Sequence, residues 1–252
     1  MRKRQPDLAD GYRLLNELTG WSGILESGKD FESGVYRVVG VPDQPADELC
    51  CQVDPFCYIS HLSAMRYYGL TNRSPAKLIL TTPARPLWYK LRDAQMAKDY
   101  GTDLDDIESV VNLKRYEFGN RVRDRGVHRH ESRHPGEWRQ VRGKATRVSS
   151  IGWTFLDMLD KPNWCGGINH VIEVWENEAR TYLEEIISAV NRAPTTIDKV
   201  RAGYLLDERL GIQDQRIHEW LRHVQRGGSR RLDPESPYQP EFSEKWMISL
   251  NV

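Results

Sequence analysis

Eleven lysine and arginine residues lie between Lys114 and Arg147, a density that suits the binding of phosphate. Four acidic residues share the segment, which leaves a net charge of +7 over 34 residues. Such a segment attracts nucleic acid mainly by releasing counterions. Tyr116, Phe118 and Trp138 within it could stack on bases, and a solvated basic hairpin without a ligand is the alternative. The expected DNA contacts are three N-terminal residues and six from this segment: Arg2, Lys3, Arg4, Arg121, Arg123, Arg125, Arg129, Arg139 and Arg142.

Two further groups have residue types that could hold a metal ion. The stretch Gly101-Thr-Asp-Leu-Asp-Asp106 has carboxylates two residues apart, which in a strand could bind Mg²⁺ as in a nucleotidyltransferase. Because the glycine adjoins these carboxylates instead of lying well upstream, an acidic helix start over 103–108 is favoured. His128, His130 and His134 could bind zinc or copper, but no cysteine or carboxylate completes the set. A basic loop without a metal is the expectation there.

Ser60 and His61 stand at the start of an apparent helix, where a hydroxyl can serve as a nucleophile or as a cap. No histidine and aspartate partners occupy a recognisable catalytic motif, so Ser60 is predicted to be an N-cap. His61 is expected to be a capping or surface histidine. The chain contains neither a phosphate-binding glycine loop nor a nucleophile elbow. The prediction is a protein that is not an enzyme and needs no cofactor.

The composition of the 252 residues is that of an ordinary globular protein, with 39% hydrophobic residues and a formal net charge of zero. No run approaches the roughly 18 to 20 apolar residues that span a bilayer, and the first residues lack the apolar part of a secretory signal. We therefore expect a cytoplasmic protein that does not enter a membrane. The four cysteines form no C-x-x-C pair and are expected to be reduced and partly buried: Cys50, Cys51, Cys57 and Cys165.

The spacing of apolar residues predicts two parts of unequal size. Residues 7–19 have helical spacing, and 34–39 resemble a strand. The stretch 41–54 contains two prolines and several acids, which favours a linker. These features predict a small N-terminal module over 1–50 and a larger domain over 51–252.

The larger domain is expected to be mostly helical, which makes the whole chain α+β. A helix from Ser60 should end at Gly69, since glycine can adopt the left-handed conformation that closes a last turn. The longest apolar stripe predicts one continuous helix over 168–190 with an acidic outer face. Shorter helices are expected over 151–160, 195–205 and 217–224, and strands over 76–82, around 110–148 and over 245–250.

Four motifs occur in an order and spacing that resemble the AbiEi antitoxins of type IV toxin–antitoxin systems. They are Tyr58-Ile-Ser-His-Leu-Ser-Ala-Met-Arg-Tyr-Tyr-Gly-Leu-Thr71, Val148-Ser-Ser-Ile-Gly-Trp-Thr-Phe-Leu-Asp-Met-Leu-Asp-Lys-Pro162, Gly166-Gly167-Ile168 and Arg201-Ala-Gly-Tyr-Leu-Leu206. The tail Arg226-Gly-Gly-Ser-Arg-Arg-Leu-Asp-Pro234 is also similar to the end of that family. The resemblance covers residues 55 to 252, and the four motifs together are moderately specific.

The resemblance implies a DNA-binding transcriptional repressor of its own promoter that opposes a nucleotidyltransferase toxin in phage defence. An N-terminal winged helix would bind the DNA, and the C-terminal domain would act as the antitoxin. Before Val41 this chain has room for one helix and a wing, so the module is expected to be a partial, degenerate winged helix. Gly152-Trp153 also replaces a charged pair that the family usually has. The alternative is a non-enzymatic protein-interaction module that neutralises a toxin without binding DNA.

Overall fold

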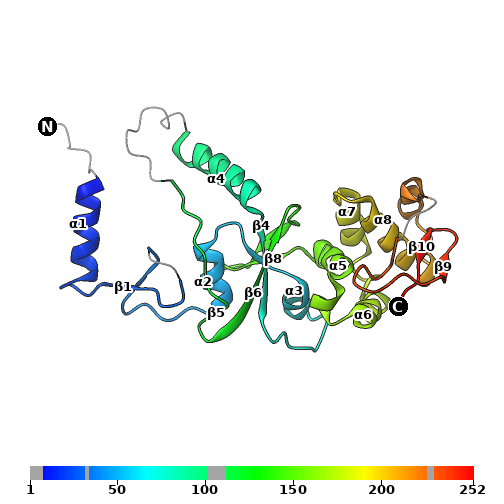
Figure 1. Cartoon of the computed structure of the whole chain (residues 1–252), viewed down its shortest axis with the longest axis horizontal. Helices are drawn as coiled ribbons and strands as arrows, with labels where there is room; N and C mark the ends of the chain where they lie inside the picture. Colours follow the sequence, from blue (N-terminus) through cyan, green and yellow to red (C-terminus); the bar gives the residue numbers. More distant parts are fainter. Residues whose placement is uncertain (1–7, 32–33, 102–111, 226–229) are drawn as a thin grey trace.

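The protein is an α+β structure, as its sequence predicts. A computed structural model describes residues 8–31, 34–101, 112–225 and 230–252. Figure 1 shows a slender N-terminal arm at one end, a mixed sheet with helices on both sides in the middle, and a cluster of helices at the other end.

The N-terminal arm consists of one helix and one short hairpin. Helix α1 (Leu8–Thr19) is followed by strands β1 (Leu25–Ser27) and β2 (Tyr36–Val38), which pair antiparallel. Helix α1 projects away from the rest of the molecule (Figure 1). The described part of the arm therefore contains a single helix and one short hairpin.

The prediction of a linker over 41–54 is wrong for most of that stretch, because helix α2 (Ala46–Val53) forms there. Pro45 takes the N-cap position, and Asp47 and Glu48 lie in the first turn. Proline and carboxylates favour the start of a helix as well as a loop. Cys50 and Cys51 of α2 are fully buried beside the sheet, so the predicted boundary after residue 50 falls inside a packed helix.

The central sheet has six strands in the order β5-β6-β4-β3-β8-β7. Strands β3 and β8 are parallel, as are β4 and β6, whereas the remaining neighbours are antiparallel. The strands are β3 (Tyr58–Ile59), β4 (Leu78–Pro83), β5 (Arg121–Val122), β6 (Arg125–Ser132), β7 (Trp138–Gln140) and β8 (Arg147–Ser149). The basic segment 114–147 thus supplies the strands at both edges of the sheet.

Helices cover both faces of this sheet. Leu78, Leu80 and Val127 belong to one face and pack with α2 in a common core. Helix α4 (Arg85–Tyr100) follows β4 directly and contacts it. On the other side lie α3 (His61–Tyr68) and α5 (Ile151–Asp160), which also pack on each other.

Helix α3 ends as the sequence predicts, since Gly69 has a φ of 73° and its N–H bonds to the carbonyls of Met65 and Arg66. The predicted single helix over 168–190 is wrong, because α6 (Ile168–Glu178) and α7 (Leu183–Arg192) are separate helices. Acidic residues lie where the second helix begins, since Glu184 and Glu185 are in the first turn of α7 and stabilise its positive N-terminal end. The apolar stripe continues across both helices because each buries its face in the same core.

The C-terminal half packs around Trp175, Phe155 and Trp246, all of which are fully buried. Its other elements are η2 (Pro162–Cys165), α8 (Thr196–Gly203), η3 (Tyr204–Arg209), α9 (Gln215–His218), η4 (Glu219–His223), β9 (Phe242–Ser243) and β10 (Ile248–Ser249). The predicted strand at the end of the chain is thereby reduced to the two residues of β10. All four cysteines are free and buried, as expected. Within the described ranges, no helix has the length and apolar character needed to cross a membrane.

Candidate functional site

Three of the predicted DNA contacts meet at the turn between β5 and β6. Arg123 and Asp124 form this turn with φ angles of 49° and 59°, the conformation of a two-residue type I′ hairpin. Arg121 and Arg125 flank the turn and are exposed. Arg123 is partly buried, and its guanidinium lies 2.8 Å from Asp43 and 4.0 Å from Asp30. Arg121 and Arg125 therefore remain exposed at this corner, with the guanidinium of Arg121 4.0 Å from the carboxylate of Asp124.

Arg129 is largely covered, with 16% of its side chain exposed. It lies in the middle of β6, where its guanidinium pairs with Glu117 and packs over the ring of Phe118. Arg115 is buried beside it and contacts Glu117 at 3.1 Å and Glu131 at 2.6 Å. These carboxylates neutralise both arginines, so the cluster joins β6 to the preceding segment and is structural.

Arg139 and Arg142 lie at a different part of the sheet from the β5–β6 turn. Arg139 is on the edge strand β7, with its guanidinium 5.0 Å from the ring centre of Tyr68. Arg142 is exposed in the turn after β7. Four strand spacings separate β6 from β7, which is roughly 19 Å. Because β6 and β7 run in the same direction, the β5–β6 and β7–β8 turns also lie at opposite ends of the sheet.

The structure thus divides the basic segment among two corners and the interior. Arg147, near its end, is also buried and donates to the carbonyls of Asp54 at 2.6 Å and Cys57 at 2.8 Å, at the end of α2. Four of the nine expected contacts are exposed: Arg121, Arg125, Arg139 and Arg142. Arg121 lies 4.0 Å from the carboxylate of Asp124, and the other three have no carboxylate partner within the described chain. The predicted contacts Arg2, Lys3 and Arg4 lie outside the described residues, as does the carboxylate motif after Gly101.

The N-terminal arm has no core of its own. Among the described residues from 9 to 45, none is buried. Eight large apolar side chains of this arm are exposed: Tyr12, Leu14, Trp21, Ile24, Tyr36, Val38, Val39 and Val41. Trp21 is the most open of them, with 86% of its surface exposed. Exposed apolar side chains that gather in one part of a protein can mark a binding surface, so the arm is a candidate for one.

Ser60 occupies the N-cap position of α3, as predicted, but its hydroxyl makes no capping bond. It accepts a hydrogen bond from Thr81 at 2.8 Å and lies 2.8 Å from Nδ1 of His61. The expectation of a capping or surface role for His61 is wrong. That residue is 2% exposed, it has a φ of 50°, and burial lowers the pKa of its ring to about 3. The ring is therefore a neutral part of the core.

A cavity of about 180 Å³ opens beside His61, between the sheet and α5. Asp157 of α5 lines it and accepts hydrogen bonds from the backbone N–H of His61 and from Ser149. Burial raises the pKa of Asp157 to about 7, although these bonds oppose the shift. Non-glycine residues in the left-handed conformation are costly and persist where surrounding contacts hold them. Here the bonds hold α3, β4, β8 and α5 together, which indicates a structural network.

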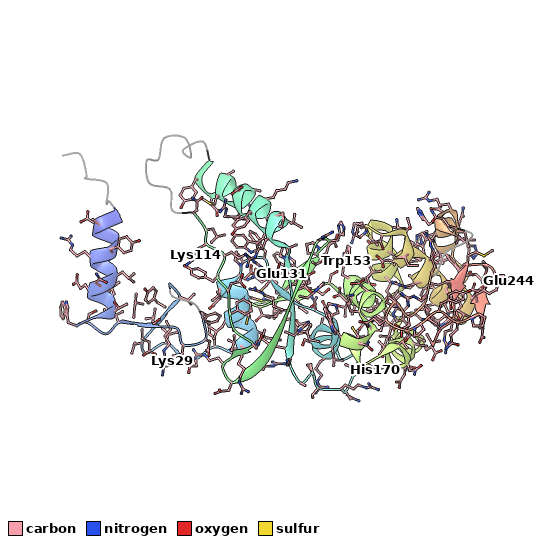
Figure 2. The ribbon with its side chains drawn as sticks, in the orientation of Figure 1. Lys29, Lys114, Glu131, Trp153, His170 and Glu244 are labelled. Atoms are coloured by element: carbon pink, nitrogen blue, oxygen red, sulfur yellow. The ribbon has the colours of Figure 1, made fainter. Side chains whose placement is uncertain are left out.

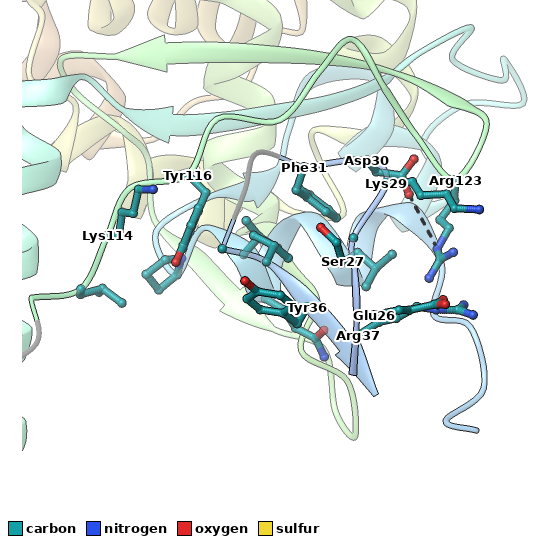
Figure 3. A pocket seen from close by; sticks show the side chains of 18 residues that line it. Glu26, Ser27, Lys29, Asp30, Phe31, Tyr36, Arg37, Lys114, Tyr116 and Arg123 are labelled. Carbon is teal, nitrogen blue, oxygen red and sulfur yellow. Dashed lines mark hydrogen bonds and ion pairs between the residues drawn. The ribbon is translucent and has the colours of Figure 1, made fainter. Parts of the chain in front are cut away.

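A larger cavity, of about 480 Å³, lies between the arm and the body. Its walls come from the β1–β2 hairpin, from α2 and from the segment before β5. Figure 3 shows Tyr116 and Lys114 at one side, Arg123 at the other, and Phe31 and Tyr36 between them. The dashed line in that view joins Arg123 to Asp30. This cavity combines aromatic rings with cations.

The histidine cluster does not form the expected basic loop. His128 and His130 lie on β6, and their rings contact Trp164 at centroid distances of 4.6 and 5.0 Å. Figure 2 shows the side chains of the whole described chain, in which no group of three or more histidine, cysteine, aspartate or glutamate residues could hold a metal ion.

Comparison of the chain with protein-family models, with curated proteins and with solved structures found no match. The site features must therefore be judged from their geometry. Sequence reasoning missed the two cavities, the buried positions of Arg115 and Arg147, and the largely covered position of Arg129. The alternation of side chains along β6 could have shown that Arg129 faces the same side as Val127, but which side is covered depends on the sheet's neighbours.

Proposed function

We propose that this chain is a non-enzymatic, antitoxin-type binding protein whose N-terminal arm docks on a protein partner. This is the interaction-module alternative left open by the resemblance to AbiEi antitoxins. The partner implied by that resemblance is a nucleotidyltransferase toxin. The observation that carries the proposal is the exposed apolar surface of an arm without a buried residue among its described positions.

The energetics of the arm favour a partner. Ordering one residue of backbone costs roughly 1–2 kcal/mol, and burial of apolar surface is the main compensation. Helix α1 has only 12 residues, which is marginal for an isolated helix in water. Covering Trp21 and Tyr12 by another protein surface would supply the missing burial. Large aromatic side chains are also the residues that most often dominate a protein interface.

The charge of the arm fits a protein surface better than a phosphate backbone. Residues 9–45 contain six acids and three basic residues, a net charge of −3. The acids are Asp10, Glu17, Glu26, Asp30, Glu32 and Asp43, and the basic residues are Arg13, Lys29 and Arg37. Within 9–45 this charge disfavours a nucleic acid, whereas residues 1–8 add Arg2, Lys3 and Arg4 and one acid, Asp7. The complementary partner has an apolar patch with a basic rim.

The test begins with the gene beside this one: where it encodes a nucleotidyltransferase, the full chain is titrated with that protein by calorimetry. We expect the double variant Tyr12→Ser, Trp21→Ser to weaken binding at least thirtyfold, because interface aromatic residues typically contribute about 2 kcal/mol or more. Tyr238→Ser is the matched control, since Tyr238 is a similarly exposed aromatic residue at the other end of the molecule. It should bind like the unmodified chain.

Thermal melts separate loss of binding from loss of folding. Neither arm residue contacts the core, so the double variant should melt like the unmodified protein. Equal affinity for the unmodified chain and the double variant would refute the docking role. Light scattering that shows a dimer dispersed by the same two substitutions would mean that a second copy, not the toxin, covers the arm.

DNA binding stays the second candidate, and one observation favours it. Arg121 and Arg125 are exposed at the same corner, and Lys77 lies beside Gly126 there without an ion pair within the described chain. A duplex of the chain's own promoter region is the probe in a gel-shift titration at low salt. Binding that is lost on joint replacement of Arg121 and Arg125 by Ala would support it, and no shift at low salt would remove it.

A further inference from the structure

The cavity between the arm and the body has the composition of a site for an aromatic anion. Its volume of about 480 Å³ falls within the roughly 300–1,000 Å³ typical of small-molecule sites. Phe31 and Tyr36 of the arm face Tyr116 of the body across it (Figure 3). Leu49 and Val53 of α2 add an apolar wall. A flat ring could therefore be enclosed between aromatic and aliphatic surfaces.

The cations of the cavity differ in how well they are neutralised. Arg37 pairs with Glu26 and with Asp43, whose carboxylate also holds Arg123. Lys29 and Lys114, by contrast, have no carboxylate partner among the described residues. Lys114 lies 5.0 Å from the ring centre of Tyr116, so a positive charge and an aromatic surface adjoin each other.

The side chain of Arg123 is a second observation that favours a polar ligand in this cavity. Its Nε atom is buried and has no hydrogen-bond acceptor in the described chain. The nearest carboxylate oxygen, on Asp30, is 4.0 Å away, which is beyond hydrogen-bond length. A buried N–H without an acceptor is costly, and an anionic ligand oxygen would satisfy it.

The wall at Tyr116 is closely fitted. Gly34 has a φ of 105°, and a Cβ built on it would lie 3.2 Å from the Tyr116 ring. Only glycine adopts this conformation without strain and also lets the hairpin approach the ring so closely. The hairpin and Tyr116 therefore form a continuous wall of the cavity.

We propose that this cavity binds a nucleotide, with its base between the aromatic rings and its phosphate at Lys114; Lys29 and Arg123 lie at the opposite side of the cavity (Figure 3). Base stacking on aromatic side chains contributes about 1–3 kcal/mol per base, and lysine binds phosphate as a point charge. The nucleotide is either free or one residue of a nucleic-acid strand, and both present the same chemistry to the cavity. This inference is independent of the toxin partner.

The experiment is an NMR titration of the full chain, with the backbone amide of Gly34 as the reporter. The probes are the four nucleoside 5′-monophosphates, the matching nucleosides, inorganic phosphate and a short single-stranded oligonucleotide. We expect at least one monophosphate or the oligonucleotide to shift the Gly34 signal in a saturable manner. If a monophosphate binds, the ligand of the cavity is a free nucleotide. If only the oligonucleotide binds, the ligand is one residue of a nucleic-acid strand.

Two variants separate the roles of charge and ring. Lys114→Gln should weaken nucleotide binding about tenfold and leave nucleoside binding unchanged. Tyr116→Leu should weaken both, and a thermal melt checks that it still folds. Lys144→Gln, an exposed lysine in the β7–β8 turn, is the control and should change neither.

Three results would overturn the proposal. They are no saturable shift with any nucleotide or oligonucleotide, inorganic phosphate binding as tightly as the nucleotides, or equal losses in Lys114→Gln and the Lys144→Gln control. Each would mean that the cavity does not recognise a base joined to a phosphate.

Discussion

Replacing Gly152 by Ala tests the closest approach between two helices of the C-terminal half. Gly152 lies in the first turn of α5, where that helix crosses α7. A Cβ built on it would lie 2.1 Å from the carbonyl oxygen of Glu185 and 2.9 Å from Cβ of Ala189. An ordinary contact begins at 3.4 Å, so α5 and α7 would have to separate by about 1.3 Å.

The expected result is a lower melting temperature despite the better helix propensity of alanine. Overpacking costs about 1–3 kcal/mol, and the high end applies because the obstacle is backbone instead of a flexible side chain. Alanine is more favourable than glycine within a helix by about 0.5–1 kcal/mol, which offsets part of this cost. The net loss of about 2 kcal/mol corresponds to a fall of roughly 4–8 °C in a chain of this size.

Gly11→Ala is the matched control, because a Cβ on Gly11 of α1 would meet nothing within 4 Å. Differential scanning calorimetry of both variants measures the difference. An unchanged or raised melting temperature for Gly152→Ala would refute the reasoning, since the two helices would then not be in contact at this point.

Three further changes test other parts of the structure. Trp175→Ala should lower the free energy of unfolding by roughly 3–5 kcal/mol in chemical denaturation, because this ring is fully buried. Glu176→Gln should change it by less than about 1 kcal/mol, since its ion-pair partner Arg209 is a surface residue. Similar effects from the two variants would contradict the assignment of Trp175 to the core. Burial that raises the pKa of Asp157 favours its protonated form, so its contribution to stability is present below pH 4 and is lost as the pH rises toward 7. Asp157→Asn should therefore gain stability relative to the unmodified protein between pH 5 and pH 8 in thermal melts, and a pH-independent difference would count against the shift. If the protein binds duplex DNA through the three exposed predicted contacts without a carboxylate partner, Arg125, Arg139 and Arg142, log affinity should fall against log salt with a slope of about 2.7. A slope near 8 would mean that all nine predicted residues contact phosphate.

Local patterns in the sequence were sufficient for several elements. The helical spacing and Gly69 define α3 and its end, because a left-handed glycine closes a helix through bonds between neighbouring residues. The apolar stripe over 168–190 correctly marks the main core, with Trp175 inside it. The α+β class follows in the same way from the alternation and periodicity of apolar residues.

Where the sequence reasoning failed, the local signal had two meanings. Pro45 and the acids after it fit a loop and also the start of α2, and burial of Cys50 against the sheet decides for the helix. Between Glu178 and Leu183, neither glycine nor proline marks the break, which forms because α6 and α7 each pack separately into the core.

The sequence by itself determined which residues are charged, apolar or able to turn, since these properties belong to each residue and its neighbours along the chain. It could not determine which charges reach solvent. Arg121 and Arg129 look alike in sequence, yet the sheet leaves the first exposed and places the second beside Glu117. The tertiary structure alone decided this, because the pairing of β6 with β4 fixes which side of each strand the helices cover. The same pairing of distant segments placed Tyr116 opposite the N-terminal hairpin and created the cavity there.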